Sequence, residues 1–354
     1  SLGVVFPKRE LLAQMNSLHR RTVLLAAGGL ILLLVVSGLV ARSIARPLRR
    51  MAAATEQVAR GNLDIDLSDI RSEDEVGQLA RSFTAMTGDL KKYIKDLTVT
   101  TAAKQRIESE LSIAARIQRS MLPTVFPAFP DRDEFDIFAM MRPAKEVGGD
   151  FYDFFFLDDD HLCVVIGDVS GKGVPAALFM SVTKYLIEAA LGMGEAPDRA
   201  LARVNRHLAD NNESCMFVTI FMGILNVKSG DFLYANAGHN PPLLWDRDRE
   251  PSFLEPPGGP VVGIMDDAVF RMDRLSFKPG TVLLAYTDGV TEAFSADGIA
   301  FSEERLVQAA TPIREKCVKE ITDDLVREID SFCVGAPQAD DITILALRHY
   351  GVTH

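Results

Sequence analysis

The feature that most constrains this chain is a run of nineteen uncharged residues, 23–41, dominated by leucine, valine, alanine and glycine. A helix of that length is about what a lipid bilayer requires. A cleaved signal peptide is one alternative, but the run is long and is followed by arginines instead of a small-residue cleavage site. A buried helix of a globular domain is the other alternative. We interpret residues 23–41 as a transmembrane helix.

Positive charge next to a membrane span favours the cytoplasmic side. Four arginines lie within residues 42–50, whereas two, Arg20 and Arg21, precede the run. The four cysteines form no Cys-x-x-Cys pair, which favours reduced thiols in an intracellular compartment. The chain after the span is therefore expected in the cytoplasm at the cell membrane. Residues 1–22 are expected to be the remnant of an extracytoplasmic sensor region, because residues 3–7 resemble the end of a strand.

Residues 42–95 have the pattern of two helices joined by a non-helical connector. Apolar residues recur at helical spacing from Ile44 to Val58, with Pro47 in the first turn, and Gly61 follows where the helix should end. Acidic residues at 73–75 open a second helix. The segments 46–48, 61–63 and 74–79 resemble those of a HAMP domain. The resemblance implies a dimeric, parallel four-helix bundle that passes a signal from the membrane.

The second helical stripe continues without a break from Val76 to Met121. Eleven of its fourteen seam positions are apolar, and the exceptions are Thr100, Lys104 and Gln118. This pattern predicts a coiled-coil connector over residues 96–124 in a parallel homodimer. A long helix packed on its own domain is the alternative. The weak middle of the seam would suit a two-state element.

Residues 125–354 have a different pattern and are expected to form one domain. Short β-type runs alternate with helical stretches, and residues 228–231 form a good hairpin turn. This order predicts an α+β fold with a central antiparallel β-sheet structure and outer layers of helices. Expected strands cover 135–141, 162–169, 217–227, 231–236, 282–287 and 342–347, and expected helices cover 175–191, 200–210, 303–310 and 317–332.

Four stretches of this domain place an aspartate next to a hydrophobic run: residues 148–153, 166–171, 287–289 and 339–343. Any one of them alone would be read as a turn or loop. Together they predict convergent carboxylates, which repel one another unless cations lie among them. Hard divalent ions such as Mg²⁺ and Mn²⁺ are bound by such oxygens, and paired metals hydrolyse phosphate esters. The net charge of −11 argues against nucleic acid as a partner.

Six segments in a fixed order make the family recognisable. They are 114–118 (AARIQ), 143–153 (PAKEVGGDFYD), 167–173 (GDVSGKG), 236–242 (NAGHNPP), 286–292 (YTDGVTE) and 340–343 (DDIT). They resemble the PPM-type metal-dependent protein serine/threonine phosphatases, in the bacterial branch that regulates sigma factors in stress response and sporulation. The resemblance implies a β-sandwich with helices on both faces, two Mn²⁺ or Mg²⁺ ions, and a phosphorylated anti-sigma-factor antagonist as partner.

The resemblance also implies roles for individual residues. Asp168 is expected to bridge the two ions, and the backbone carbonyl of Val169 to complete a shell. The other expected ligands are Asp150, Asp288 and Asp340. Water activated by the two cations would then attack phosphorus in line with the serine leaving group.

Other polar residues near these motifs have less certain roles. Asp153 and Asp341 are expected either to support the metal ligands without binding the ions or to be structural. His239 is either a general acid or a structural loop histidine, because Ser170 stands where eukaryotic relatives carry a histidine. Phosphate-binding candidates are Arg142 and Lys145.

Two other functions compete with a membrane-anchored phosphatase. A diguanylate cyclase often follows a HAMP domain, and residues 148–151 resemble its signature, but Phe151-Tyr152 follow Asp150 where that signature needs Glu-Phe. A catalytically inactive, phosphatase-like receptor would only bind partners. The presence of all four candidate metal aspartates disfavours this second alternative.

Overall fold

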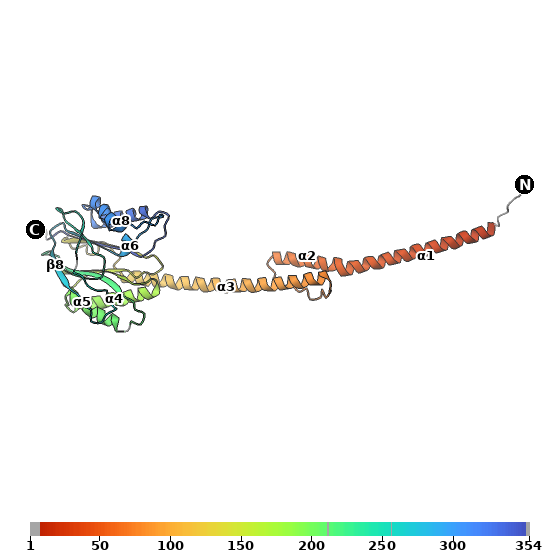
Figure 1. Ribbon diagram of the computed structural model, residues 1–354, viewed down its shortest axis with the longest axis horizontal. Coiled ribbons are helices and arrows are strands. Elements are labelled where there is room, and N and C mark those ends of the chain that lie inside the picture. Colours follow the sequence, from red (N-terminus) through yellow and green to blue (C-terminus); the bar gives the residue numbers. More distant parts are fainter. Residues whose placement is uncertain (1–7, 211, 256, 352–354) are drawn as a thin grey trace. The chain divides into compact units, whose positions relative to one another are not determined.

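The computed structural model describes residues 8–210, 212–255 and 257–351, and it divides into two compact units, Ser1–Arg106 and Ile107–His354 (Figure 1). Residues 3–7, expected as the end of a strand, lie outside the described residues. Each unit is described by itself below.

The first unit begins with a nearly continuous helical segment. It consists of α1 (Lys8–Val40), the π-helical turn η1 (Ala41–Ala45) and α2 (Arg46–Ala59). Residues 8–22 are thus helical and continue directly into the expected span. The stretch Met15–Ala59 contains a window of mean hydropathy 2.8 with none of its residues buried. By length and composition this helix is suited to cross a membrane.

The connector between α2 and α3 packs through a small apolar cluster. Met51, Ala54, Leu67 and Ala80 are its buried members. Asp74 caps the next helix, because its Oδ1 accepts hydrogen bonds from the backbone N–H groups of Val76 and Gly77. A Cβ at Gly77 would lie 1.7 Å from the carbonyl oxygen of Ser72, so only glycine fits there. Local packing therefore accounts for the Asp-Glu-x-Gly entry to this helix.

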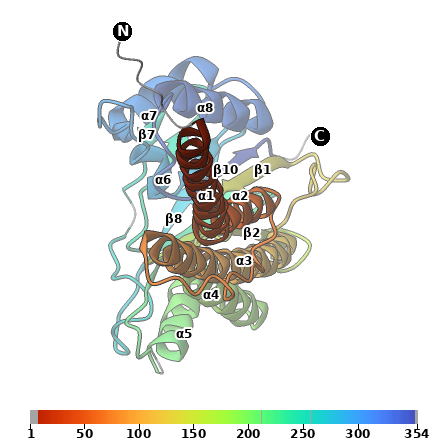
Figure 2. The ribbon, with the colours of Figure 1, turned by 90° about the vertical axis from the view of Figure 1, so that its right-hand side faces the viewer.

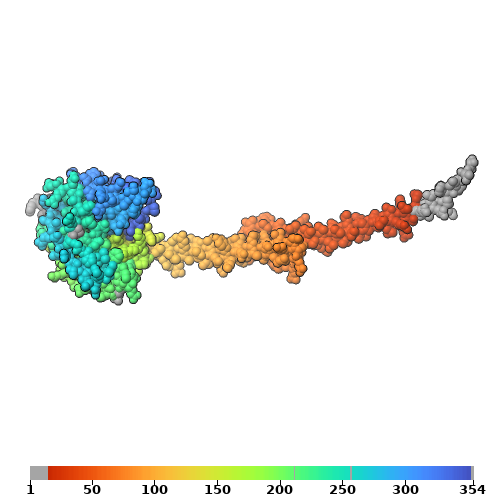
Figure 3. All heavy atoms as spheres, in the orientation of Figure 1, coloured from red at the N-terminus to blue at the C-terminus, as the bar shows by residue number. Residues whose placement is uncertain are grey.

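Helix α3 (Glu75–Met121) is one unbroken helix of 47 residues, as the apolar stripe predicts. Such a helix is roughly 70 Å long. Every residue from 88 to 110 is exposed (Figure 3). Within this stretch, the Nζ of Lys91 lies 2.5 Å from Oδ1 of Asp64 in the connector. The last residues of α3 belong to the second unit, where Gln118 and Leu122 are buried.

Two antiparallel five-stranded sheets form the second unit. Sheet A has the order β1-β10-β9-β6-β7, and sheet B has the order β2-β3-β4-β5-β8. The strands are β1 (Phe135–Arg142), β2 (Phe151–Phe156), β3 (His161–Val169), β4 (Val218–Asn226), β5 (Asp231–Ala237), β6 (Leu243–Trp245), β7 (Ser252–Phe253), β8 (Met272–Ser276), β9 (Val282–Tyr286) and β10 (Ile342–His349). The expected α+β sandwich is confirmed.

Helices cover the outer faces of both sheets (Figures 1 and 2). Helices α4 (Val174–Gly192) and α5 (Pro197–Ala209) lie on sheet B, whereas α7 (Ser302–Ala310) and α8 (Val318–Phe332) lie on sheet A. Two short helices complete the unit, α6 (Asp288–Thr291) and the 3₁₀ turn η2 (Thr311–Ile313). Helix α4 is also apolar enough to cross a membrane, but it packs on the sheet through Ala176, Met180 and Ile187.

Strand β10 explains why the sandwich has two apolar layers. Its side chains alternate between the two faces of sheet A. Leu345 and Leu347 join the core between the sheets, while Ile344 and Ala346 join the cluster beneath α7 and α8. Both faces are buried, so the strand is apolar at Ile342 and throughout Ile344–Leu347.

Candidate metal centre

The strand register brings the expected metal ligands to one end of the sandwich. In sheet B, Phe151 of β2 pairs with Gly167 of β3, and continuing this antiparallel register places Asp150 opposite Asp168. In sheet A, Tyr286 of β9 pairs with Ile344 of β10. Asp288 follows β9 and Asp340 precedes β10, so these two aspartates lie at the same end of their sheet.

Asp150 is the most deeply buried of the four carboxylates, at 1% exposure. Its Oδ2 accepts hydrogen bonds from the hydroxyl of Thr287 at 2.7 Å and from that of Thr343 at 2.6 Å. Burial raises the pKa of Asp150 well above its ordinary value, and the neighbouring Asp168 raises it further. The two threonines thus fix the orientation of this buried carboxylate.

Asp168 interacts with all three of the other expected ligands. Burial raises its pKa to about 7, and repulsion from Asp288 and Asp340 adds to the shift, while a hydrogen bond from the Asp150 carboxyl opposes it. The pKa of Asp288 is raised to about 6 by burial and by repulsion from Glu292 and Asp340. The four carboxylates therefore form one electrostatically coupled group.

Lys172 provides the positive charge nearest to this group. Its Nζ lies 2.8 Å from Oδ2 of Asp340 and donates a hydrogen bond to the carbonyl of Ala339 at 2.5 Å. One ammonium group does not balance four carboxylates, so repulsion adds to the effect of burial in raising the pKa values of Asp168 and Asp288. Hard divalent cations would relieve this repulsion, so the donor set fits the expected Mn²⁺ or Mg²⁺.

The backbone carbonyl of Val169 lies beside the residue that precedes Asp150. A Cβ at Gly149 would lie 2.8 Å from this oxygen, so the carbonyl faces the loop that leads into Asp150. The carboxylates are neighbours without forming a closed shell: within the described part of the chain, no three aspartate, glutamate, histidine or cysteine side chains stand ready to hold a metal ion. The assignment of individual ligands is therefore a proposal, made below.

Asp341 holds the loop that carries Asp150. Its Oδ1 accepts a hydrogen bond from the backbone N–H of Ala144 and its Oδ2 one from that of Gly149, both at 2.7 Å. A Cβ at Gly289 would lie 1.9 Å from the carbonyl oxygen of Asp341. The glycine after Asp288 is thus required by the close approach of two chain segments.

Asp153 has a contact on helix α4, away from the four carboxylates. It lies 2.6 Å from the Nζ of Lys184, and both side chains are largely buried. This ion pair links β2 to α4, which accounts for Asp153 in structural terms.

His239 is packed inside the domain as a neutral imidazole. It is 5% exposed, and its Nδ1 lies 2.8 Å from the hydroxyl of Thr219. The side-chain amide of Asn236 donates a hydrogen bond to the backbone carbonyl of His239 and accepts one from its backbone N–H group. Burial lowers the pKa of His239 to about 4, so near neutral pH the side chain is the neutral imidazole and lacks the extra proton of the imidazolium that a general acid would give up. These contacts favour the structural interpretation of His239 over the general acid.

The contacts of Arg142, Lys145 and Ser170 give none of them a direct role at the four carboxylates. Arg142 lies 2.7 Å from Asp330 of α8, so its charge is already paired. Lys145 is exposed. The hydroxyl of Ser170 accepts a hydrogen bond from the backbone N–H of Phe217 at 2.9 Å.

Four residues that shape the centre received no role from the sequence: Lys172, Thr287, Thr343 and Gln118. The amide of Gln118 forms two hydrogen bonds with Gly148, donating to its carbonyl at 2.6 Å and accepting from its N–H at 3.1 Å. The sequence feature that could have indicated a role for Gln118 is a polar residue at a position of the apolar seam, because a buried polar side chain needs a hydrogen-bond partner. The last turn of α3 is thus tied to the loop before Asp150.

Comparison with known proteins agrees with this geometry. Residues 158–350 match the family described as stage II sporulation protein E. The match covers more than half of the chain. The chain belongs to the stage II sporulation protein E family. Its second unit is a PP2C-type phosphatase domain, so the expected PPM-type resemblance is confirmed, and residues 39–92 match the HAMP domain.

Two curated relatives are 32% identical to the chain. IcfG of Synechocystis sp. aligns with 90% of this chain and 55% of its own length, and the phosphoserine phosphatase RsbU of Bacillus subtilis aligns with 69% and 71%. The chain thus spans about half the length of IcfG. Among solved structures, the SiaA-PP2C domain of Pseudomonas aeruginosa covers 70% of this chain and 98% of its own, with a TM-score of 0.62 and 23% identity. That likeness supports the fold.

Proposed function

We propose that this chain is a membrane-anchored protein phosphatase that hydrolyses phosphoserine or phosphothreonine on a partner protein. The observation that carries the proposal is the coupling of Asp150, Asp168, Asp288 and Asp340 at one end of the sandwich, in a chain of this family. These four carboxylates and the carbonyl of Val169 would hold two Mn²⁺ or Mg²⁺ ions. Asp168 would bridge them, since it interacts with the other three carboxylates.

The cations, when bound, would activate water and neutralise charge on the phosphoryl group. The residues of the chain supply positioning. Thr287 and Thr343 orient the Asp150 carboxylate, and Asp341 fixes the loop before it. In-line attack on phosphorus depends on such fixed geometry, because positioning and charge stabilisation dominate phosphoryl transfer.

The partner that we propose is a phosphorylated anti-sigma-factor antagonist. RsbU and RsbP of Bacillus subtilis both carry the name phosphoserine phosphatase, which supports phosphoserine as the target. The net charge of −11 disfavours nucleic acid as an alternative partner.

We assign residues 23–41 to a transmembrane helix, 42–95 to the HAMP domain, 96–124 to a coiled-coil connector and 125–354 to a cytoplasmic phosphatase domain. A parallel homodimer is supported by exposed apolar side chains along α3, among them Leu90, Tyr93, Leu97 and Ile107. Isolated exposed leucines are common, but a helical series of them is typical of a coiled-coil seam.

The decisive experiment is Mn²⁺-dependent release of phosphate from a phosphoserine-containing antagonist protein by the full chain in detergent. Asp168→Asn should abolish release while leaving the circular dichroism spectrum unchanged, because the amide cannot bridge two cations. Asp131→Asn, at an exposed position, is the matched control. Wild-type turnover by Asp168→Asn would disprove the ligand assignment. Binding of the phosphoprotein without release would favour an inactive receptor, and synthesis of a cyclic dinucleotide from GTP would favour the cyclase.

A further inference from the structure

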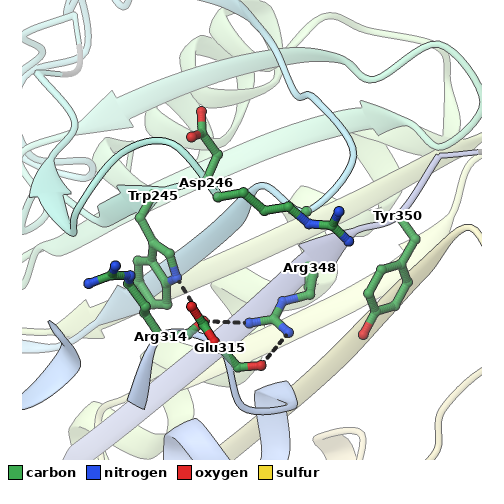
Figure 4. Close-up of a pocket in the computed structure, with 8 residues that line it drawn as sticks. Trp245, Asp246, Arg314, Glu315, Arg348 and Tyr350 are labelled. Atoms are coloured by element: carbon green, nitrogen blue, oxygen red, sulfur yellow. Dashed lines mark hydrogen bonds between the residues drawn. The ribbon is translucent and has the colours of Figure 1, made fainter. Parts of the chain in front are cut away.

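A second pocket lies at the opposite end of sheet A from the metal centre. It has a volume of about 420 Å³ and is lined by Trp245, Asp246, Arg247, Gly280, Arg314, Glu315, Arg348 and Tyr350, and we call it the arginine pocket. Strand β10 runs from the metal centre, near Ile342, to this pocket at Arg348, a distance of roughly 20 Å. Figure 4 shows the Arg348 side chain between the Arg314–Glu315 turn and Tyr350.

Within the described residues Arg348 forms no ion pair, although Asp136 lies opposite it on β1 and attracts its charge. Its terminal nitrogens donate hydrogen bonds to the backbone carbonyls of Arg314 at 2.7 Å and Glu315 at 3.4 Å (Figure 4). Its Nε is buried and has no hydrogen-bond partner. Neutral carbonyls orient a guanidinium group without cancelling its charge. Arg348 is therefore fixed in place as a cation in the wall of the pocket.

The two other guanidinium groups are weakly compensated. Arg314 lies 3.5 Å from Glu250, whose side chain is 75% exposed, and such surface pairs contribute little. Arg247 is exposed, as Glu315 is, and it makes no side-chain hydrogen bond or ion pair with any residue in the described ranges. Three cationic side chains from separate segments thus meet in a protein whose net charge is −11.

Two carboxylates also line the pocket, but they do not cancel this charge. Oδ1 of Asp246 accepts hydrogen bonds from the backbone N–H groups of Asp248 and Arg249, which directs this oxygen into its own turn. Glu315 is exposed. The lining residues retain a formal charge of +1, from three arginines and two acids.

We propose that the arginine pocket binds a small organic anion that carries a phosphate or carboxylate group. The planar guanidinium fork matches both groups by paired hydrogen bonds. Trp245, which is buried and fixed by a hydrogen bond from its Nε1 to the Arg314 carbonyl, supplies an apolar surface for the rest of the ligand. The volume lies within the range of small-molecule sites. Because the pocket is remote from the metal centre, its ligand does not compete with the phosphoprotein.

Trp245 is the only tryptophan of the chain, so its fluorescence reports on this pocket directly. The full chain, in non-ionic detergent and without divalent metal, is titrated with inorganic phosphate, citrate or chloride at constant ionic strength. We expect a saturable fluorescence change and a rise in the melting temperature with phosphate or citrate, and neither with chloride. The stronger of the two probes identifies the anionic group.

Arg247→Gln removes the unpaired guanidinium and should weaken binding about tenfold or more, as loss of a charge-assisted hydrogen bond predicts. Arg274→Gln, on the exposed edge strand β8, is the matched control and should bind as the wild type does. Mn²⁺-dependent phosphate release should be the same in both variants without added anion. The proposal is overturned if neither probe gives a saturable change, or if Arg247→Gln binds them as tightly as the wild type.

Discussion

The two hydrogen bonds of Gln118 are the contact through which the end of α3 holds the loop before Asp150, and Gln118→Ala removes both. The side chain is 7% exposed, and the Gly148 N–H and C=O groups that it contacts are also buried. Leaving a buried polar group without a partner costs about 1–3 kcal/mol. Two such groups give a loss of about 2–6 kcal/mol, reduced to the extent that the loop moves to find other partners.

The effect of Gln118→Ala is measurable whether the loop stays in place with unpaired groups or moves to find other partners. Urea unfolding of the full chain in non-ionic detergent, followed by Trp245 fluorescence, reports the free energy of unfolding of the phosphatase domain. Mn²⁺ titration reports the centre, because Asp150 is two residues from Gly148. We expect a loss of stability, weaker Mn²⁺ binding, or both. Gln105→Ala, at an exposed position of the same helix, is the control. If Gln118→Ala behaved as this control in both measurements, the contact would have no energetic importance.

Three further predictions concern single contacts. Thr343→Val removes one hydrogen bond to Asp150 and should weaken Mn²⁺ binding about tenfold, measured by calorimetry, because such a bond contributes about 1–2 kcal/mol; unchanged affinity would contradict the role of this threonine. Gly289→Ala brings a Cβ against the Asp341 carbonyl and should lower both the melting temperature and Mn²⁺ affinity, whereas Gly192→Ala, with open space around it, should lower neither. Burial lowers the pKa of His239 in the folded state to about 4, from an ordinary value of 6.5. Between these two pH values the unfolded state binds more protons than the folded state does. The free energy of unfolding therefore falls as the pH drops through this window, by about 3 kcal/mol in all. In His239→Gln this part of the pH dependence of urea unfolding should be absent, and an unchanged profile would show that the histidine is not buried neutral.

The principal strands of the phosphatase domain could be predicted from the sequence because they are largely buried, and the helices because their buried residues recur at helical spacing. Strand β10 is apolar at Ile342 and throughout Ile344–Leu347, and its observed extent, 342–349, contains the expected 342–347. Strand β8 could not be predicted in this way. Its five residues are exposed except for one of intermediate burial, so no alternation of apolar and polar side chains marks it. Strand β2 was missed because its aromatic run follows directly on a motif that was interpreted as a loop.

The aspartates of the centre could be predicted because they stand in short, ordered motifs. Their supporting contacts could not, since each joins residues far apart in the chain. Thr343 and Asp150 are separated by 193 positions, and Gln118 and Gly148 by 30. Such pairs depend on strand register and helix placement, which local sequence does not specify. Gln118 was counted as a defect in the apolar seam, although in the structure it is buried against a backbone partner.

Helix α3 combines two properties that bear on signalling. Its residues 88–110 are all exposed, so the apolar side chains of this stretch are not buried by the chain itself. Its last turn, in contrast, is fixed to the domain by Gln118 and by Leu122, which is buried in the core. In the homodimer proposed above, a change in the pairing of this stretch with a second copy would bury or expose those side chains, whereas a rotation of the last turn would have to break the hydrogen bonds to Gly148. The association state of α3 and the position of the Asp150 loop would then be thermodynamically linked, in the sense that a free-energy difference between two arrangements of one shifts the other.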